Sequence, residues 1–419
     1  MKNYRNYISL AFICFLMTTL SSSDKKHLEK ENLAEQYSLD NPLSPQYKVF
    51  HVNDTTTSIY YQFNFNDFKY IPNVDSSVFT TKYLLNYELM NDYSGKEIID
   101  SASITFYDSD NYNKNNSSLG YFDIPAKYGK NYILRLMLKD LNSKKEVVKI
   151  IEIKKSDYLN RHNFYLMAMD GLPLMNNYVS RQTKYKIVYN QLKTKILYGV
   201  FFEGFFEAAN PPTSNNPQKD IIKLKPDSSF TINLTNGKSE IIEFNRQGFY
   251  HFYKDSSKQD GFTIYVHTTA YPFVSTPMQM LMPLRYITTN SEFKKLFSSE
   301  NKKKSVDDFW LQISSSSARA RSMISIYYNR VQQANVLFSA DREGWMTDRG
   351  MLYIVMGPPE RVYKNTGLET WFYGTASKMQ TISFNFVEVD NPFTENDFRL
   401  DRSTTYYNSW SSAMEVWRR

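Results

Sequence analysis

The feature that most constrains the fold is a change of hydrophobic spacing near residue 285. Upstream, short segments alternate apolar and polar positions, most clearly over residues 131–139, where every second residue is Tyr or Leu. Downstream, residues 316–338 repeat apolar side chains every three or four positions without a Gly or Pro. Spacing of two is typical of a strand with one buried face, and spacing of 3.6 is typical of an amphipathic helix. The sequence therefore predicts a β-rich first part and a last part that mixes helices with strands.

The β-rich part divides into two predicted domains. Residues 47–156 contain several short strand candidates separated by turns, which is typical of an immunoglobulin-like or fibronectin-like β-sandwich. Residues 157–280 form a second β-rich domain, in which Asn236-Gly237 has the composition of a hairpin turn. The 33 tyrosines and 29 phenylalanines of the chain agree with this prediction, because aromatic side chains favour pleated, half-buried surfaces.

Residues 281–419 are predicted to form an α+β domain. Thr289 and Glu292 have the spacing of a capping box, a second helix is expected to start near Ser305, and the long helix follows from residue 316. Strands are expected at residues 352–356, 369–373 and 381–389, and an amphipathic helix is expected in the tail. In this prediction, residues 344–348 form the point at which helix gives way to sheet.

The N-terminus has the pattern of an export signal. Residues 1–23 combine Lys2 and Arg5 with an apolar stretch of about 13 residues that is too short for a good membrane-spanning helix. Residues 24–46 are polar and are predicted to be a linker. Cys14 is the single cysteine and lies within the expected signal peptide; acylation at Cys14, which would give a lipid anchor, is the alternative to its removal. Cleavage near residue 23 would leave an extracytoplasmic protein without a thiol and without a transmembrane helix.

The remaining composition argues against several classes of function. The formal charge of +7 is spread along the chain, whereas nucleic-acid binders concentrate basic residues in a patch. The five histidines are scattered and form no H-E-x-x-H pair, and phosphate-binding glycine loops are absent from the sequence. We therefore expect no nucleic acid, no metal and no cofactor among the ligands.

A run of residues from Gly344 to Pro359 resembles the signature of the GWxTD-domain family. It reads Gly344-Trp345-Met346-Thr347-Asp348-Arg349-Gly350 and ends in Gly357-Pro358-Pro359. The resemblance extends to residues 308–310 and 328–335 upstream and to residues 369–373 downstream. It implies a bacterial envelope protein of the kind found in the Bacteroidota, with a signal peptide, one or two β domains and a terminal GWxTD domain. It implies no established activity and no agreed catalytic residues.

Two interpretations of the signature remain open. In the structural one, Gly344 and Gly350 permit close packing, Trp345 is a buried anchor, Thr347 and Asp348 cap a turn, and Asp348 pairs with Arg349. In the functional one, a polar cluster lines a cleft and its carboxylates perform acid/base chemistry on a glycoside. The candidate residues are Gly344, Trp345, Thr347, Asp348, Arg349, Gly350, Gly357, Pro358, Pro359, Glu369, Trp371 and Arg330, the last expected to pair with Asp348 or Glu369.

The leading functional hypothesis is a non-enzymatic interaction or assembly protein of the bacterial cell envelope, located in the periplasm or at the outer membrane. Its expected partners are other envelope proteins. The alternative is a carbohydrate-binding protein or glycan-acting hydrolase that uses the Asp, Glu and Arg residues of the GWxTD signature, and a weaker third hypothesis is a surface adhesin.

Overall fold

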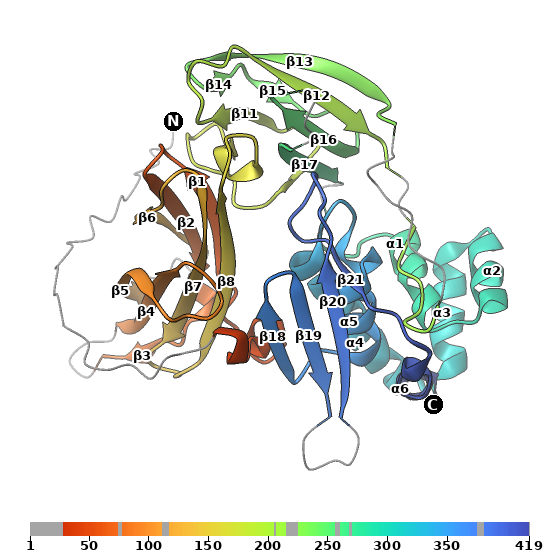
Figure 1. Ribbon diagram of the computed structural model, residues 1–419. Coiled ribbons are helices and arrows are strands. Elements are labelled where there is room, and N and C mark those ends of the chain that lie inside the picture. The colour runs from red at the N-terminus through yellow and green to blue at the C-terminus, as the bar shows by residue number, and fades with distance from the viewer. Residues whose placement is uncertain are drawn as a thin grey trace.

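Three units surround a common junction in the computed structural model (Figure 1). The structure describes residues 28–73, 78–110, 117–204, 207–214, 225–255, 260–267, 270–374 and 381–418. The first two units are built from β-sheets, and the third combines helices with a smaller sheet. The predicted signal peptide and Cys14 lie outside the described residues.

The first unit consists of two antiparallel sheets that face one another. The three-stranded sheet contains β1 (Gln46–His51), β2 (Thr56–Asn64) and β6 (Ser117–Pro125). The five-stranded sheet contains β3 (Ile71–Pro72), β4 (Phe79–Met90), β5 (Ile98–Asp110), β7 (Lys130–Asp140) and β8 (Glu146–Lys155). Inward-facing residues of both sheets, among them Ile59, Phe63, Leu85 and Leu134, form one core. The predicted alternation of residues 131–139 is confirmed as β7.

The other face of β7 is buried as well, and the N-terminal segment explains why. This segment contains two short 3-10 helices, η1 (Leu28–Lys30) and η2 (Ala34–Tyr37). Glu31 forms a bidentate ion pair with Arg135 of β7, and the backbone N–H of Leu33 donates to the carbonyl of Val362 in the third unit at 2.8 Å. Within the segment predicted to be a polar linker, Leu33, Ala34 and Tyr37 are buried in the core of the third unit and Leu43 in that of the first, whereas Leu39 is exposed.

The second unit is a nine-stranded arrangement in which β12 (Ile196–Phe202), β16 (Gly248–Tyr253) and β17 (Phe262–His267) lie side by side. The other strands are β9 (Phe164–Met167), β10 (Tyr178–Ser180), β11 (Lys184–Tyr189), β13 (Ser228–Thr235), β14 (Lys238–Ser239) and β15 (Ile242–Glu243). The predicted turn at Asn236-Gly237 joins β13 to β14, and both residues have positive φ, at 50° and 72°. This backbone is the one that an Asn-Gly hairpin turn adopts at low cost.

The third unit packs its helices against one antiparallel sheet (Figure 1). The sheet has the order β18 (Arg361–Asn365), β19 (Leu368–Tyr373), β20 (Ile382–Glu388) and β21 (Phe398–Leu400). The helices are α1 (Pro277–Leu281), α2 (Asn290–Ser298), α3 (Lys302–Ile313), α4 (Ser317–Phe338), α5 (Asp348–Met356) and α6 (Tyr407–Arg418). The capping box of Thr289 and Glu292 and the long helix are confirmed, whereas α3 starts at Lys302 under an Asn301 cap instead of near Ser305.

One predicted strand is a helix. Residues 352–356 belong to α5, which is buried along nearly its whole length. An apolar run that is buried on all sides has no polar face, so its spacing does not distinguish a strand from a helix. Helix α5 therefore lies within the signature run, and the sheet begins only at Arg361. Within the described residues, no helix combines the length and the apolar character needed to cross a membrane.

Candidate functional site

The glycines of the signature allow backbone contacts that leave no room for a side chain. A Cβ atom on Gly344 would lie 1.9 Å from the carbonyl oxygen of Ala334 in α4. A Cβ atom on Gly350, in the first turn of α5, would lie 1.9 Å from the carbonyl oxygen of Gly344. Helix α4, the signature loop and α5 therefore pack backbone to backbone, as the structural interpretation predicts.

Trp345 is buried between these helices. Its backbone N–H donates to Oδ1 of Asn335 at 3.1 Å, and its indole N–H donates to Oε2 of Glu343 at 2.6 Å. Because only 6% of Trp345 is exposed, its ring does not offer a stacking surface to a ligand. Thr347 caps α5: its hydroxyl oxygen accepts from the N–H of Gly350 at 3.0 Å.

Asp348 pairs with an arginine that the sequence did not suggest. Its carboxylate accepts from both Nη atoms of Arg402 and from the backbone N–H of Leu400, the latter at 2.8 Å. Burial raises the pKa of Asp348, and the charge of Arg402 opposes this rise. The predicted pair of Asp348 with Arg349 is wrong, because Arg349 points to the other side of α5 and binds Glu369.

Arg349 and Glu369 form a separate buried ion pair, with Nη1 and Oε2 3.2 Å apart. Glu369 also accepts from the hydroxyl of Tyr37 at 2.9 Å and from the indole N–H of Trp371 at 2.6 Å. Since Tyr37 comes from the N-terminal segment, this pair joins α5, the sheet and the start of the described chain. The guanidinium of Arg349 also lies 4.3 Å from the ring centroid of Phe398.

Arg330 pairs with neither Asp348 nor Glu369. Its Nη1 donates to the carbonyls of Ile354 and Val355 at 3.1 and 3.4 Å, at the C-terminal end of α5. Gly357 ends this helix with a φ of +92°, and a Cβ there would lie 2.8 Å from Nη2 of Arg330. Pro358 and Pro359 therefore follow a helix and lead into β18.

The predicted polar cluster is thus divided into three separate contacts. Asp348 and Glu369 are 2% and 3% exposed, each is neutralised by an arginine, and neither lines either of the two pockets described below. This arrangement gives no support to glycoside hydrolysis by these carboxylates, because a catalytic acid must reach its substrate. The three contacts hold α4, α5, the sheet and the N-terminal segment together.

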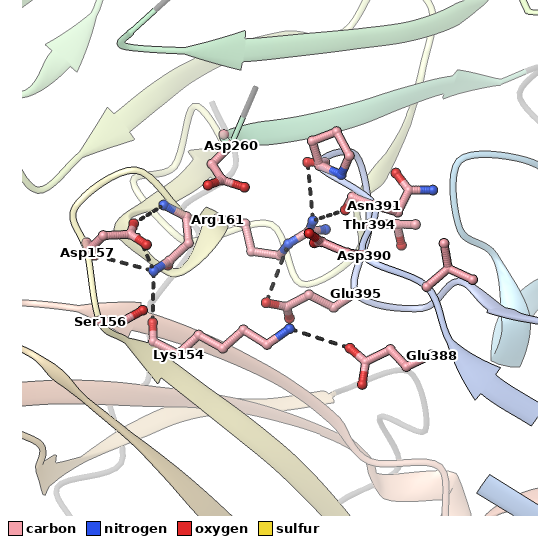
Figure 2. A pocket seen from close by; sticks show the side chains of 14 residues that line it. Lys154, Ser156, Asp157, Arg161, Asp260, Glu388, Asp390, Asn391, Thr394 and Glu395 are labelled. Atoms are coloured by element: carbon pink, nitrogen blue, oxygen red, sulfur yellow. Dashed lines mark hydrogen bonds and ion pairs between the residues drawn. The ribbon is translucent and has the colours of Figure 1, made fainter. Parts of the chain in front are cut away.

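A polar cavity of about 180 Å³ lies where the three units meet (Figure 2). Lys154, at the end of β8, binds Glu388 of β20 with its Nζ 3.4 Å from Oε1. Arg161 lies 3.6 Å from Oε1 of Glu395 and donates to the carbonyl of Phe393 at 3.3 Å. Asp260, in the loop before β17 of the second unit, also lines the cavity. We call this set the junction.

Two histidines lie beside the junction. The ring of His51 packs edge-on against the ring of His162 at 5.5 Å, and Nε2 of His162 lies 3.3 Å from Glu395. Burial, together with the neighbouring His162, lowers the pKa of His51 to about 3. Burial alone would raise the pKa of Glu395, but His162, Arg161 and Lys154 hold it well below its usual value.

The sequence could not reveal the junction, because its ion-paired residues are more than 200 positions apart in the chain and belong to no motif. In the part of the chain that the structure describes, no three His, Cys, Asp or Glu side chains are grouped so that they could hold a metal ion.

Comparisons with known proteins identify the third unit. Residues 248–419 match the family model of the GWxTD domain, a range that also takes in β16 and β17 of the second unit. No curated protein matches the chain. A crystal structure of red sea bream transglutaminase is similar at 9% identity and a TM-score of 0.19, over 54% of this chain and 31% of that one. The chain spans less than a third of that structure, and a likeness at this level carries no argument about fold or function. The signature, its buried contacts and the family match together show that residues 248–419 contain a GWxTD domain.

Proposed function

We propose that this protein is a non-enzymatic interaction or assembly protein of the bacterial cell envelope, acting in the periplasm or at the outer membrane. The observation that carries the proposal is that the charged residues of the family signature are buried in contacts within the protein. These residues make internal contacts that hold the helices and the sheet of the third unit to one another and to the N-terminal segment. The outer surfaces of the protein are then available for binding and are held in a fixed geometry.

Contacts between the second and third units support this view. The backbone N–H of Ala209 donates to the carbonyl of Met346 within the signature at 2.8 Å, and Arg402 donates to the carbonyl of Asn210 at 3.2 Å. Phe393, from the loop after β20, packs into a cluster of the second unit with Phe202 and Phe249. Buried aromatic contacts of this kind favour a rigid arrangement over freely moving domains.

The edge strand β5 is the surface that we expect to bind a partner. Within the described residues β5, which is 13 residues long, pairs with β4 alone and carries no Lys, Arg or Pro. Ile98, Ile99 and Tyr107 are exposed along it. An exposed strand edge of this length can accept a strand from another protein, with main-chain hydrogen bonds supplying affinity.

The proposed location rests on the pattern of residues 1–23, a basic start followed by an apolar stretch and three serines. An immunoglobulin-like or fibronectin-like first unit is part of the same proposal, because such sandwiches are common scaffolds of extracytoplasmic proteins. Its support is the pair of facing antiparallel sheets in that unit.

Site-specific cross-linking in intact cells tests the proposal. A photoreactive residue in place of Tyr107, which is 72% exposed on β5, should yield a discrete cross-linked product with another envelope protein. The matched control is the same residue at Val416, which is 70% exposed on α6. Fractionation of the cells should place the protein outside the cytoplasm, with residues 1–23 removed. Recovery in the cytoplasm, or a monomer without cross-links from β5, would contradict the proposal.

A further inference from the structure

A second pocket lies on the outer face of the three-stranded sheet, beside the second unit. Its volume is about 500 Å³, and every residue that lines it is polar and uncharged. Five of these side chains are amides, namely Gln46, Gln62, Asn64, Asn66 and Asn176, and the remaining two are serines. We call this set the amide pocket.

The alternation of β2 explains why the amides collect on one face. Ile59, Tyr61 and Phe63 point into the core of the first unit, so Gln62 and Asn64 point outward. Gln62 lies opposite Gln46 of β1 and Leu119 of β6, while Asn64 lies opposite Ser117. The sheet therefore places hydrogen-bonding side chains from three neighbouring strands next to each other.

The second unit closes one side of the pocket. Gln46 donates from Nε2 to Oδ1 of Asn176 at 3.3 Å, and Gln62 donates from Nε2 to the hydroxyl of Ser117 at 2.9 Å. Each amide has two N–H donors and an oxygen with two lone pairs, so these contacts leave further donors and acceptors available. The two bonds also limit the rotamers of Gln46 and Gln62, which lowers the entropic cost of binding a ligand.

Two tyrosines lie two residues further along the strands, on the same face of the sheet. Tyr60 and Tyr121 lie opposite each other in the register of β2 and β6, next to the pair of Gln62 and Leu119. Their ring centroids are 5.5 Å apart, and Tyr121 is 62% exposed. Side chains two residues apart on a strand point in the same direction, so these rings lie on the same sheet face as Gln62, which lines the amide pocket.

We propose that the amide pocket and Tyr121 bind a neutral saccharide of one or two pyranose rings. A sugar hydroxyl is both a donor and an acceptor, which is the property that amide side chains share. The C–H face of a pyranose ring is apolar and can pack on an exposed aromatic ring such as that of Tyr121. The lack of charge in the lining disfavours phosphate, carboxylate and cationic ligands, and 500 Å³ lies within the range of pockets that bind small ligands. This site is independent of the GWxTD signature and of strand β5, so it adds a ligand class to the proposed function.

Binding to oligosaccharides tests the inference. The full-length exported protein would be applied to an array of neutral and acidic oligosaccharides, and the strongest neutral one would be titrated by calorimetry. We expect binding to neutral saccharides, with affinity reduced at least about tenfold by Gln62→Ala and by Tyr121→Ala. Tyr407→Ala is the matched control, because Tyr407 is 64% exposed on α6 and distant from the pocket in the fold.

Three results would overturn the inference. They are no binding to any neutral saccharide at millimolar concentration, a preference for acidic saccharides, or equal affinity in the wild type and both pocket variants while all of them keep the same melting temperature. Displacement of the saccharide from the pocket by an uncharged peptide at lower concentration would assign the pocket to peptides instead. Cross-linking through β5 is expected to be unchanged in Tyr121→Ala, so failure here leaves the proposed function standing.

Discussion

At the scale of single residues, two glycines of the signature leave no room for a side chain. Gly344 and Gly350 lie against main-chain carbonyls, which cannot move aside as a side chain can. The two glycines in the sequence predict close packing at both positions but not its partners, because the distance between α4 and the loop depends on the packed third unit.

Gly344→Ala is predicted to destabilise the protein by at least about 3 kcal/mol, since the added methyl group would force α4 and the signature loop apart. Urea unfolding followed by tryptophan fluorescence measures this loss. Gly129→Ala is the control: Gly129 has a φ of +84° but open space around its Cβ position, so about 1 kcal/mol is expected there. Equal losses for the two variants would contradict the role of close packing at Gly344.

At the scale of elements, helix α5 depends on contacts at both ends. Thr347 caps its first turn, and Arg330 of α4 binds two of its last carbonyls. Arg330 also lies over the ring of Trp417 in α6, with its guanidinium 5.2 Å from the ring centroid. One arginine therefore joins three helices, a role that sequence spacing along α4 could not indicate.

Arg330→Met is predicted to cost about 2 kcal/mol, because two charge-assisted hydrogen bonds at the end of α5 are lost while most of the packing volume is kept. Arg321→Met on the exposed side of the same helix is the matched control and should change stability by less than about 0.5 kcal/mol. Hydrogen exchange should increase at the last turn of α5 in the first variant alone. Unchanged protection there would mean that Arg330 does not cap the helix.

At the scale of the whole molecule, His51, which lies beside the junction, makes the stability of the fold sensitive to acid. The neutral ring of His51 bonds with Thr57 at 2.9 Å and with the carbonyl of Lys154 at 2.8 Å, between β1 and the end of β8. Its pKa is about 3 in the folded chain, whereas an unfolded histidine has a pKa of about 6.5. Below pH 6.5 the unfolded chain therefore binds a proton that the folded chain does not, and stability falls as the pH falls.

Between pH 6.5 and 5, His51 should account for a loss of about 2 kcal/mol, and His51→Gln should remove that part of the pH dependence. His267, whose pKa burial lowers to about 4, contributes in the same direction and remains in the variant. Urea unfolding of the wild type and of His51→Gln at a series of pH values measures the pH dependence of stability in each protein. Parallel profiles for wild type and His51→Gln would refute the role of His51.

Phe393 tests the fixed arrangement of the units directly. Phe393→Ala is predicted to loosen the second unit from the third and to increase the radius of gyration in small-angle scattering, while the circular dichroism of the sheets is kept. Val387→Ala, at a half-exposed position of β20, is the control and should leave the scattering profile unchanged. The same radius of gyration in both variants would mean that the other contacts between the units are sufficient.

The sequence by itself determined the order of β and helical regions, the long helix α4, the capping box of α2, the Asn-Gly turn and the GWxTD signature. Each of these depends on residues close together in the chain, where spacing and backbone preferences act locally. Only the tertiary structure decided that residues 352–356 are helical, that Leu33, Ala34 and Tyr37 are buried in the core of the third unit, and that Asp348 binds Arg402 while Arg349 binds Glu369. The physical reason is the same in each case: burial on all sides removes the polar face that periodicity needs, and charge pairing depends on distances in space that spacing along the chain does not contain.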